Sequence, residues 1–490
     1  MSIMTTINDT NLSNKYQQKT DKQHILDNPD TYIGSVEIIE SEQFVFSSNK
    51  IREKNIQYVP ALFKLFDEGI VNCRDHAIRM AKAVEENVEN SINVSYIDVI
   101  IEEKDGGIIT MLNDGNGIDV AVHPETQLWI PEMIFGHLRT STNYDKTEKK
   151  IVGGKNGFGF KLVLIWSMYG SIETVDHIRG LKYFQEFKEN LNIINPPVIT
   201  KHKGKPYTKI TFRPDYTRLG IEGLTEDMIS LFRKRVYDIA AVTDKNLKVR
   251  YNSQHIPVKN FTQYIDLYIG SKEETPRVYE SGGDRWEYAV AISSTHEFTQ
   301  VSFVNGIHTS KGGKHVEYIL NQITRKLTEF IEKKKKIKVN MTSIKEQIIL
   351  FIRCDIENPA FDSQTKDYMN TPFQKFGSTC VVSDKFIEKI AKLGIMDAAC
   401  ALTEIKTNKA VKRMDGHKTK TIRGIPKLVD ANWAGTEKSN QTIIIFCEGD
   451  SAKAGIVSGL SSEDRNIIGV YPMKGKIMNV RGETKLSLSD

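Results

Sequence analysis

Glu68 and Asn72 are the first side chains along this sequence whose types and spacing suit catalysis. Apolar residues recur at helical spacing between positions 62 and 72, so this segment predicts a helix that carries both side chains on one face. A carboxylate can take a proton from a water molecule, and a carboxamide one turn away can offer an uncharged oxygen to Mg²⁺. Considered by itself, the pair is more typical of an exposed glutamate beside a turn-favouring asparagine.

A strand hairpin ending in a polar turn is predicted next. Residues 99–101 and 108–112 have the composition of strands, and the second runs into the turn NDGNG at 113–117. An aspartate at the end of a buried strand can accept a hydrogen bond from an adenine amino group, and the flanking glycines leave room for a flat base. A simple Asx turn is the alternative at this position.

A glycine-rich segment, GGKNGFGFK at 153–161, follows the hairpin. Without Cβ atoms in the way, its backbone N–H groups can approach phosphate oxygens, and a helix that starts at its end adds a positive dipole terminus. One such cluster is weak evidence, because most glycine clusters are turns. The order of the three elements, helix, polar turn and phosphate loop, is what predicts an ATP site.

These elements resemble the GHKL ATPases and, within them, the eukaryotic-type type IIA DNA topoisomerases. The similarity covers nearly the whole chain, through residues 16–20, 28–35, 66–72, 130–138, 361–366 and 448–452. It implies an α+β fold, in which a GHKL (Bergerat) ATPase sandwich precedes an S5-like α+β transducer domain and the first part of an α/β TOPRIM domain. We place the ATPase domain with its N-terminal strap at 1–251, the transducer at 252–405, a basic linker at 406–440 and the TOPRIM part at 441–490.

The resemblance also implies ATP and Mg²⁺ as cofactors and gives roles to individual residues. Glu68 is the expected general base, Asn72 the magnesium ligand and Asp114 the adenine reader, with Asn113 beside it. Gln364 and Lys366 are expected to extend from the second domain to the γ-phosphate. Further nucleotide contacts are expected from Tyr16 in the strap, which crosses to the partner subunit's nucleotide, and from Gly117, Ser141, Thr142, Asn143, Lys155, Asn156, Gly157, Phe158, Gly159 and Lys161.

The side-chain chemistry agrees with two of these roles, and two positions depart from the family pattern. Lys366 is a compact cation suited to a terminal phosphate, and Gln364 can donate to an oxygen without adding charge. A solvated loop lysine is the alternative at position 366. His76 stands where the family usually has asparagine, and Lys155 replaces an arginine that could bind phosphate as a bidentate fork. Both departures bear on nucleotide affinity.

Composition limits the class of protein. The 490 residues are 39% hydrophobic, enough for roughly three domains, and no apolar run reaches the length of a membrane span. We therefore expect an intracellular protein without a membrane partner, in a DNA-containing compartment that is the nucleus, or the host cell if the source is a virus. The cysteines at 73, 354, 380, 400 and 447 lack metal-ligand spacing, so we expect reduced core residues.

Positive charge is concentrated in two regions. Ten Lys and Arg residues against four acidic ones give +6 between 301 and 350, more than the +5 of the whole chain. A predicted helix there runs into Lys333, Lys334, Lys335 and Lys336; residues 406–427 form the second region. A lysine run is often a solvated helix end that complements the helix dipole. The resemblance favours sequence-independent contact with double-stranded DNA through these four lysines.

An apolar strand is predicted at 442–447, and Glu448-Gly449-Asp450-Ser451-Ala452 follows it. A carboxylate at the carboxyl end of a buried strand is where α/β sheets place their chemistry. The resemblance implies that Glu448 helps to hold the magnesium that assists DNA cleavage. The family's second acidic cluster and attacking tyrosine are not found, so we expect no DNA cleavage by this chain alone. A breakage-reunion subunit or a C-terminal remainder would supply them.

The sequence thus predicts the ATP-operated gate of a type IIA topoisomerase, a homodimer through its ATPase domain. Another GHKL ATPase, such as an Hsp90-like chaperone or a MutL-like repair protein, shares the nucleotide elements but lacks the segment at 448–452. A nucleotide-locked DNA clamp or scaffold without strand passage is an alternative of a different class.

Overall fold

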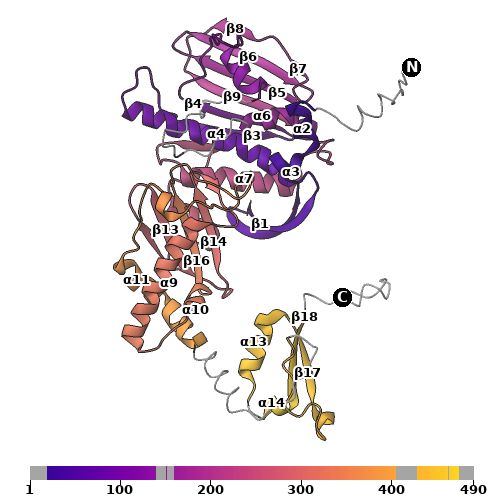
Figure 1. Cartoon of the computed structure of the whole chain (residues 1–490), viewed down its shortest axis with the longest axis vertical. Coiled ribbons are helices and arrows are strands. Elements are labelled where there is room, and N and C mark those ends of the chain that lie inside the picture. The colour runs from indigo at the N-terminus through magenta and orange to yellow at the C-terminus, as the bar shows by residue number, and fades with distance from the viewer. Residues whose placement is uncertain (1–18, 139–150, 152–158, 404–426, 462, 474–490) are drawn as a thin grey trace, which may run out of the picture. The chain divides into compact units, whose positions relative to one another are not determined.

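The computed structural model describes residues 19–138, 151, 159–403, 427–461 and 463–473, and these fall into two compact units, 1–396 and 397–490. The first unit contains two large sheets with their helices (Figure 1). The second unit contains a small parallel sheet. Within the described residues, none of the helices has the length and hydropathy that crossing a membrane requires.

The first sheet has nine strands within the described residues. Their order is β11-β10-β3-β4-β9-β5-β6-β7, with β8 paired to β6, and only the β10–β3 pair is parallel. The strands are β3 (Tyr96–Glu102), β4 (Ile108–Asp114), β5 (Ser167–Asp176), β6 (Leu181–Lys188), β7 (Ile193–Ile194), β8 (Val198–Lys201), β9 (Tyr207–Pro214), β10 (Lys248–Tyr251) and β11 (Gln254–His255). Because β11 belongs to this sheet, the domain boundary predicted at 251 falls inside it.

Two long helices pack on the first sheet, and the sequence explains where each begins. Helix α4 (Pro60–Glu85) starts with a proline, and α7 (Glu226–Val242) is capped by the side chain of Thr225. Helix α4 approaches strand β4 closely at Gly69, where a Cβ atom would lie 2.5 Å from Sδ of Met111. This close approach places Gly69, the residue after Glu68, against the sheet.

Shorter elements complete this half of the first unit. The hairpin of β1 (Ile39–Ser47) and β2 (Lys50–Tyr58) packs against α7 (Figure 1). The short helices are α2 (Asp21–Asp27), α3 (Pro29–Tyr32), α5 (Ile130–Gly136), α6 (Gly159–Ile165) and α8 (Phe261–Ile269), with a 3₁₀ turn at Lys104–Gly106.

The second sheet has five strands in the order β12-β13-β16-β14-β15, and β14 pairs with β16 in parallel. The strands are β12 (Arg277–Ser281), β13 (Trp286–Ile292), β14 (Thr299–Val304), β15 (Ile307–His308) and β16 (Ile348–Cys354). Its helices are α9 (Lys314–Lys335), α10 (Met341–Lys345) and α11 (Asp384–Ile390), with a 3₁₀ turn at Phe373–Lys375 and a π-helical turn at Ala391–Ile395. Helix α9 is the helix predicted before Lys333, and it buries an apolar face that includes Ile319, Ile323 and Leu327.

The second unit pairs β17 (Ile443–Glu448) and β18 (Ile468–Met473) in parallel, with α13 (Gly449–Gly459) and α14 (Asp464–Ile467) between them and a 3₁₀ turn at Ser439–Gln441. The apolar strand predicted before Glu448 is β17, in which Ile443 and Phe446 are 60% and 58% exposed among the described residues. Val429, within the segment predicted as a linker, exchanges backbone hydrogen bonds of 3.0 and 2.7 Å with Val470 of β18.

The predicted α+β class is confirmed, because mostly antiparallel sheets carry helices packed against them. The helix predicted around Glu68 is α4, and the predicted hairpin is the antiparallel β3–β4 pair.

Candidate active site

Helix α4 places Glu68 and Asn72 on one face, one turn apart, as predicted. Glu68 is 5% exposed, and Asn72 donates a hydrogen bond from Nδ2 to the Glu68 backbone oxygen at 2.7 Å. This bond fixes the amide, and Oδ1 of Asn72 accepts no hydrogen bond from the described residues. An uncharged amide oxygen next to a carboxylate is a donor set that fits Mg²⁺.

The start of helix α6 lies against both side chains. A Cβ atom built on Gly159 would be 3.1 Å from Oε2 of Glu68 and 3.4 Å from Nδ2 of Asn72. Two residues further along α6, burial lowers the pKa of Lys161 to about 8. The end of the predicted phosphate loop therefore meets the carboxylate and the carboxamide, with a lysine that is charged at neutral pH in the same short helix.

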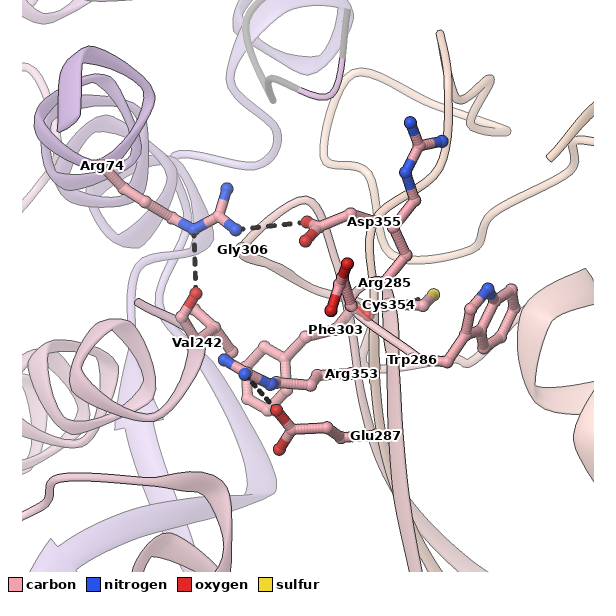
Figure 2. Close-up of a pocket in the computed structure, with 11 residues that line it drawn as sticks. Arg74, Val242, Arg285, Trp286, Glu287, Phe303, Gly306, Arg353, Cys354 and Asp355 are labelled. Carbon is pink, nitrogen blue, oxygen red and sulfur yellow. Dashed lines mark hydrogen bonds and ion pairs between the residues drawn. The ribbon is translucent and has the colours of Figure 1, made fainter. Parts of the chain in front are cut away.

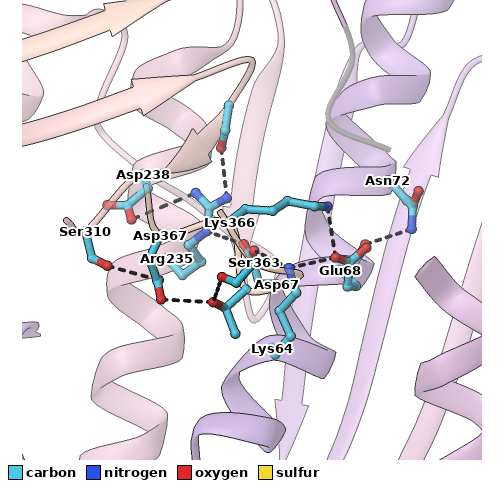
Figure 3. A network of polar contacts seen from close by, with 12 residues as sticks. Lys64, Asp67, Glu68, Asn72, Arg235, Asp238, Ser310, Ser363, Lys366 and Asp367 are labelled. Carbon is cyan, nitrogen blue, oxygen red and sulfur yellow. Dashed lines mark hydrogen bonds and ion pairs between the residues drawn. The ribbon is translucent and has the colours of Figure 1, made fainter. Parts of the chain in front are cut away.

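A lysine of the second sheet's half also reaches Glu68. The Nζ atom of Lys366, in the loop after β16, lies 3.0 Å from Oε1 of Glu68, and Nζ of Lys64 lies 2.7 Å from the same oxygen (Figure 3). Burial by itself would raise the pKa of Glu68, but the charges of Lys366 and Lys64 outweigh it and lower the pKa to about 2. Glu68 is therefore a carboxylate at every working pH.

The loop that carries Lys366 is held by its own polar contacts. Asp367 accepts hydrogen bonds from Ser310 at 3.0 Å and Thr365 at 2.9 Å, and Lys366 itself has a φ of +63°. A left-handed lysine is an uncommon conformation that neighbouring contacts must stabilise. Gln364 is half-buried in the same loop, two residues before Lys366.

The carboxylate of Asp114, the predicted adenine reader, already has partners within the fold. The Asp114 carboxylate accepts hydrogen bonds from the backbone N–H groups of Ser95, at 2.7 Å, and Tyr96, at 3.0 Å. Successive residues of a strand point to opposite faces, and Met111 of this strand faces Gly69 on α4. Asn113, two residues after Met111, therefore shares the α4 face, and Asp114 lies on the other.

Two further contacts fix the turn that follows Asn113. A Cβ atom on Gly117 would lie 2.0 Å from the Val175 backbone oxygen, so the position requires glycine. Nε2 of His76 lies 2.9 Å from the Asn116 backbone oxygen, and burial lowers the pKa of His76 to about 4. His76 is therefore neutral and joins the turn to α4.

Arginines connect the two halves of the first unit beside this site. Arg74 of α4 donates to the Val242 backbone oxygen and to Asp355, both at 3.3 Å (Figure 2). Arg353 donates to the Ala241 backbone oxygen at 3.2 Å. Helix α4 thus contacts the second sheet's half both at Glu68 and two turns later. Sequence reasoning missed these long-range pairs, which leave no local signal, and missed Lys64, which its i, i+4 spacing to Glu68 could have indicated.

Lys333, Lys334, Lys335 and Lys336 are exposed at the carboxyl end of α9. Glu448 ends β17 in the second unit, and no cluster of three or more metal-ligating side chains occurs in the described part of the chain. Tyr16, Ser141, Thr142, Asn143, Lys155, Asn156, Gly157 and Phe158 lie outside the described residues, so their predicted roles stay predictions.

Sequence comparisons find long similarities to one group of enzymes. A family model described as DNA gyrase B matches residues 260–421. The DNA topoisomerase 2 of Candida glabrata is 42% identical over 492 residues, covering 96% of this chain and 34% of that protein. The DNA topoisomerase 2 of Acanthamoeba polyphaga mimivirus is 40% identical over 494 residues, covering 99% and 38%. The chain spans about a third of the length of these relatives.

Solved structures of topoisomerase II regions are also similar to this chain. The ATPase region of Saccharomyces cerevisiae topoisomerase II superposes with a TM-score of 0.73 at 41% identity, covering 80% of this chain and 100% of that one. The ATPase and transducer domains of DNA topoisomerase II from Balamuthia mandrillaris superpose with a TM-score of 0.74 at 38% identity, covering 81% and 99%. The fold of an ATPase region followed by a transducer is thus shared.

Proposed function

This chain belongs to the type II DNA topoisomerase family, and from that premise we propose that it is the ATP-hydrolysing gate of such an enzyme. Two copies would dimerise on ATP, capture a DNA duplex for strand passage and reset on hydrolysis. Strand passage would change DNA supercoiling.

One observation supports this proposal above the others. The two oxygens of the Glu68 carboxylate meet different parts of the chain, because Oε2 faces the start of α6 while Oε1 contacts Lys366 from the second sheet's half. A carboxylate placed between a phosphate-loop helix and a cation from another domain can act on a terminal phosphate and report its loss to that domain.

The proposed roles follow from the side chains. Glu68 takes the proton of the water that attacks the γ-phosphate, and Lys366 with Gln364 contacts that phosphate. Mg²⁺ held through Asn72 would offset charge on the phosphate oxygens. When Lys366 leaves Glu68 for the phosphate, one of the two cations that lower the pKa of Glu68 is removed, so the carboxylate becomes a stronger base. Asn113, on the α4 face of β4, takes over the adenine contact from Asp114.

DNA and a second Mg²⁺ are further proposed partners. The exposed lysines 333–336 would contact DNA phosphates, and the β17–α13–β18 segment would be the first part of a TOPRIM domain in which Glu448 binds Mg²⁺. Cleavage would need a breakage-reunion subunit or a C-terminal remainder. A DNA-containing compartment, the nucleus or a virus-infected cell, is the expected location.

The hydrolytic role is tested with Glu68→Gln. We expect turnover to fall on the order of a hundredfold or more, because the base is lost, while a non-hydrolysable ATP analogue still binds. The exposed carboxylate Glu53 provides the control, and Glu53→Gln should hydrolyse ATP at the wild-type rate. A Glu68→Gln turnover within a few-fold of wild type would refute the role of Glu68.

Plasmid relaxation separates the gate from a DNA clamp. Supercoiled plasmid is incubated with the chain and ATP, with and without a candidate breakage subunit. ATP-dependent relaxation that requires both proteins supports the gate. ATP-dependent retention of circular DNA without any relaxation supports a clamp or scaffold.

A further inference from the structure

Glu68 belongs to a buried cluster of charged side chains. Ion pairs among the described residues join four cations, Lys64, Lys234, Arg235 and Lys366, to three carboxylates, Asp67, Glu68 and Asp238 (Figure 3 draws most of them). Arg235 Nε is 2.6 Å from Asp67, and Lys234 Nζ is 2.9 Å from Asp238. With those two pairs matched, Glu68 has two lysines on a single oxygen.

The two lysines are held in different ways. Lys64 lies one turn before Glu68 on α4, its side chain is 5% exposed, and its Nζ is also 3.9 Å from Asp67. Residues four apart on a helix are neighbours whatever the second domain does. Lys366 reaches Glu68 from the loop after β16, so a change in that loop can remove it. Without Lys366, the cluster has three cations for three carboxylates.

We propose that Lys64 is the positioning residue of the hydrolytic base. Lys64 holds Oε1 of Glu68 when Lys366 is drawn to a terminal phosphate, and Oε2 then stays directed at the start of α6. The inference rests on the proposed function. It adds that Lys64 stays on Glu68 while Lys366 moves to the phosphate.

The geometry supports a role of Lys64 in fixing the position of the Glu68 carboxylate, beyond neutralising its charge. Lys366 donates a hydrogen bond to Oε1 at 3.0 Å, Lys64 forms an ion pair with the same oxygen at 2.7 Å, and Oε2 is the oxygen near Gly159. A carboxylate that lost both contacts could rotate about its terminal torsion, which has a broad energy profile. A shift of the base by about 1 Å can cost on the order of a hundredfold in rate. Neutralisation of a buried carboxylate, in contrast, requires only a positive charge nearby.

The test compares Lys64→Met, which removes the charge, with Lys64→Arg, which keeps it but replaces a point contact by a planar fork. With Mg²⁺ and ATP, we expect Lys64→Met to lower kcat about tenfold or more and to change KM less than about threefold, as expected for a contact that matters in the transition state. Lys64→Arg should keep the wild-type melting temperature and still lose part of kcat. A wild-type kcat in Lys64→Arg would show neutralisation only and overturn the proposal.

A double-mutant cycle separates positioning from a general structural effect. If Lys64 acts through Glu68, Lys64→Met should add no further loss to Glu68→Gln. An additive loss would overturn the proposal. Should Lys64→Met fail to fold because Glu68 is left unpaired, Lys64→Arg carries the test. If Glu68→Gln itself hydrolyses ATP normally, the proposed function fails; if only the Lys64 variants hydrolyse normally, this inference alone fails.

Discussion

Arg235 of helix α7 places its Nε atom 2.6 Å from Oδ1 of Asp67, the residue next to the proposed base on α4. The Arg235 side chain is 1% exposed, and its Nη2 also donates to the Gly306 backbone oxygen, in the turn between β14 and β15, at 2.8 Å. One guanidinium therefore connects α4, α7 and the second sheet. Such a buried pair is costly to break, because the remaining charge has no water to solvate it.

Replacement of Arg235 should strongly destabilise the protein. Arg235→Met leaves Asp67 buried without its main partner, so we expect the free energy of unfolding to fall by about 3–5 kcal/mol. Urea denaturation of the full chain measures it. The control is Lys54→Ala, which breaks the Lys54–Asp227 pair of 2.7 Å, whose lysine is 58% exposed; there the urea midpoint should stay near that of the wild type, because exposed ion pairs contribute little. Similar losses in both variants would contradict this account.

Separate substitutions of Asn113 and Asp114 can show which side chain contacts adenine. Asn113→Ala should weaken ATP binding about tenfold, because a side chain on the α4 face loses its hydrogen bonds to the base. Asp114→Asn should instead lower the melting temperature, since the carboxylate accepts from Ser95 and Tyr96, and should leave ATP affinity nearly unchanged. Isothermal titration with a non-hydrolysable analogue and thermal melts separate the two effects. Loss of affinity only in Asp114→Asn would restore the original assignment.

Asn113 and Asp114 show which information the sequence lacks. Helical spacing was enough to predict α4 and to place Glu68 and Asn72 on one face, because the period of a helix is a local property. Neighbouring residues of a strand lie on opposite faces of the sheet. Local sequence does not indicate which of these faces a helix will cover. Gly69 and Met111, 42 positions apart, make that contact.

Long-range pairs and exposed faces were unpredictable for a related reason. Arg235 and Asp67 are 168 residues apart, and neither local composition nor spacing connects them. The apolar composition of β17 correctly predicted a strand, but burial depends on the elements that cover it, and Ile443 and Phe446 are exposed. The phosphate-contacting role of Lys366 was predicted from the family resemblance, and its contact with Glu68 emerged only from the fold.

Lys161 should make nucleotide affinity depend on pH. Burial lowers its folded-state pKa from 10.5 to about 8, so above pH 8 the folded protein loses the charge that a phosphate attracts. If only the protonated form binds, ATP affinity falls up to about tenfold per pH unit above 8. Titrations of a non-hydrolysable analogue between pH 7 and 9.5 measure it, and Lys161→Arg, which stays charged, should remove the dependence. A wild-type affinity constant over this range would contradict the prediction.

The same shift has the opposite effect on stability without nucleotide. Because the unfolded state keeps the Lys161 proton up to about 10.5, it binds more protons than the folded state between pH 8 and 10.5. The contribution of Lys161 to the free energy of unfolding therefore increases with pH through this window. Subtracting the Lys161→Arg curve from the wild-type curve isolates that contribution, and a difference that falls with rising pH would contradict the pKa shift.

DNA binding by the exposed lysines at the end of α9 should appear in the salt dependence. Each phosphate contact contributes about 0.9 to the slope of log affinity against log salt concentration, so replacing Lys333, Lys334, Lys335 and Lys336 by alanine should lower the slope by up to about 3.6 and reduce DNA-stimulated ATP hydrolysis. The matched control replaces four exposed lysines near β8 and β9, at 201, 203, 205 and 209. It removes the same charge from another surface, so its slope should stay near wild type. Equal losses in both variants would mean that net charge, and not this helix end, attracts the DNA, and an unchanged slope in the first variant would exclude contact there.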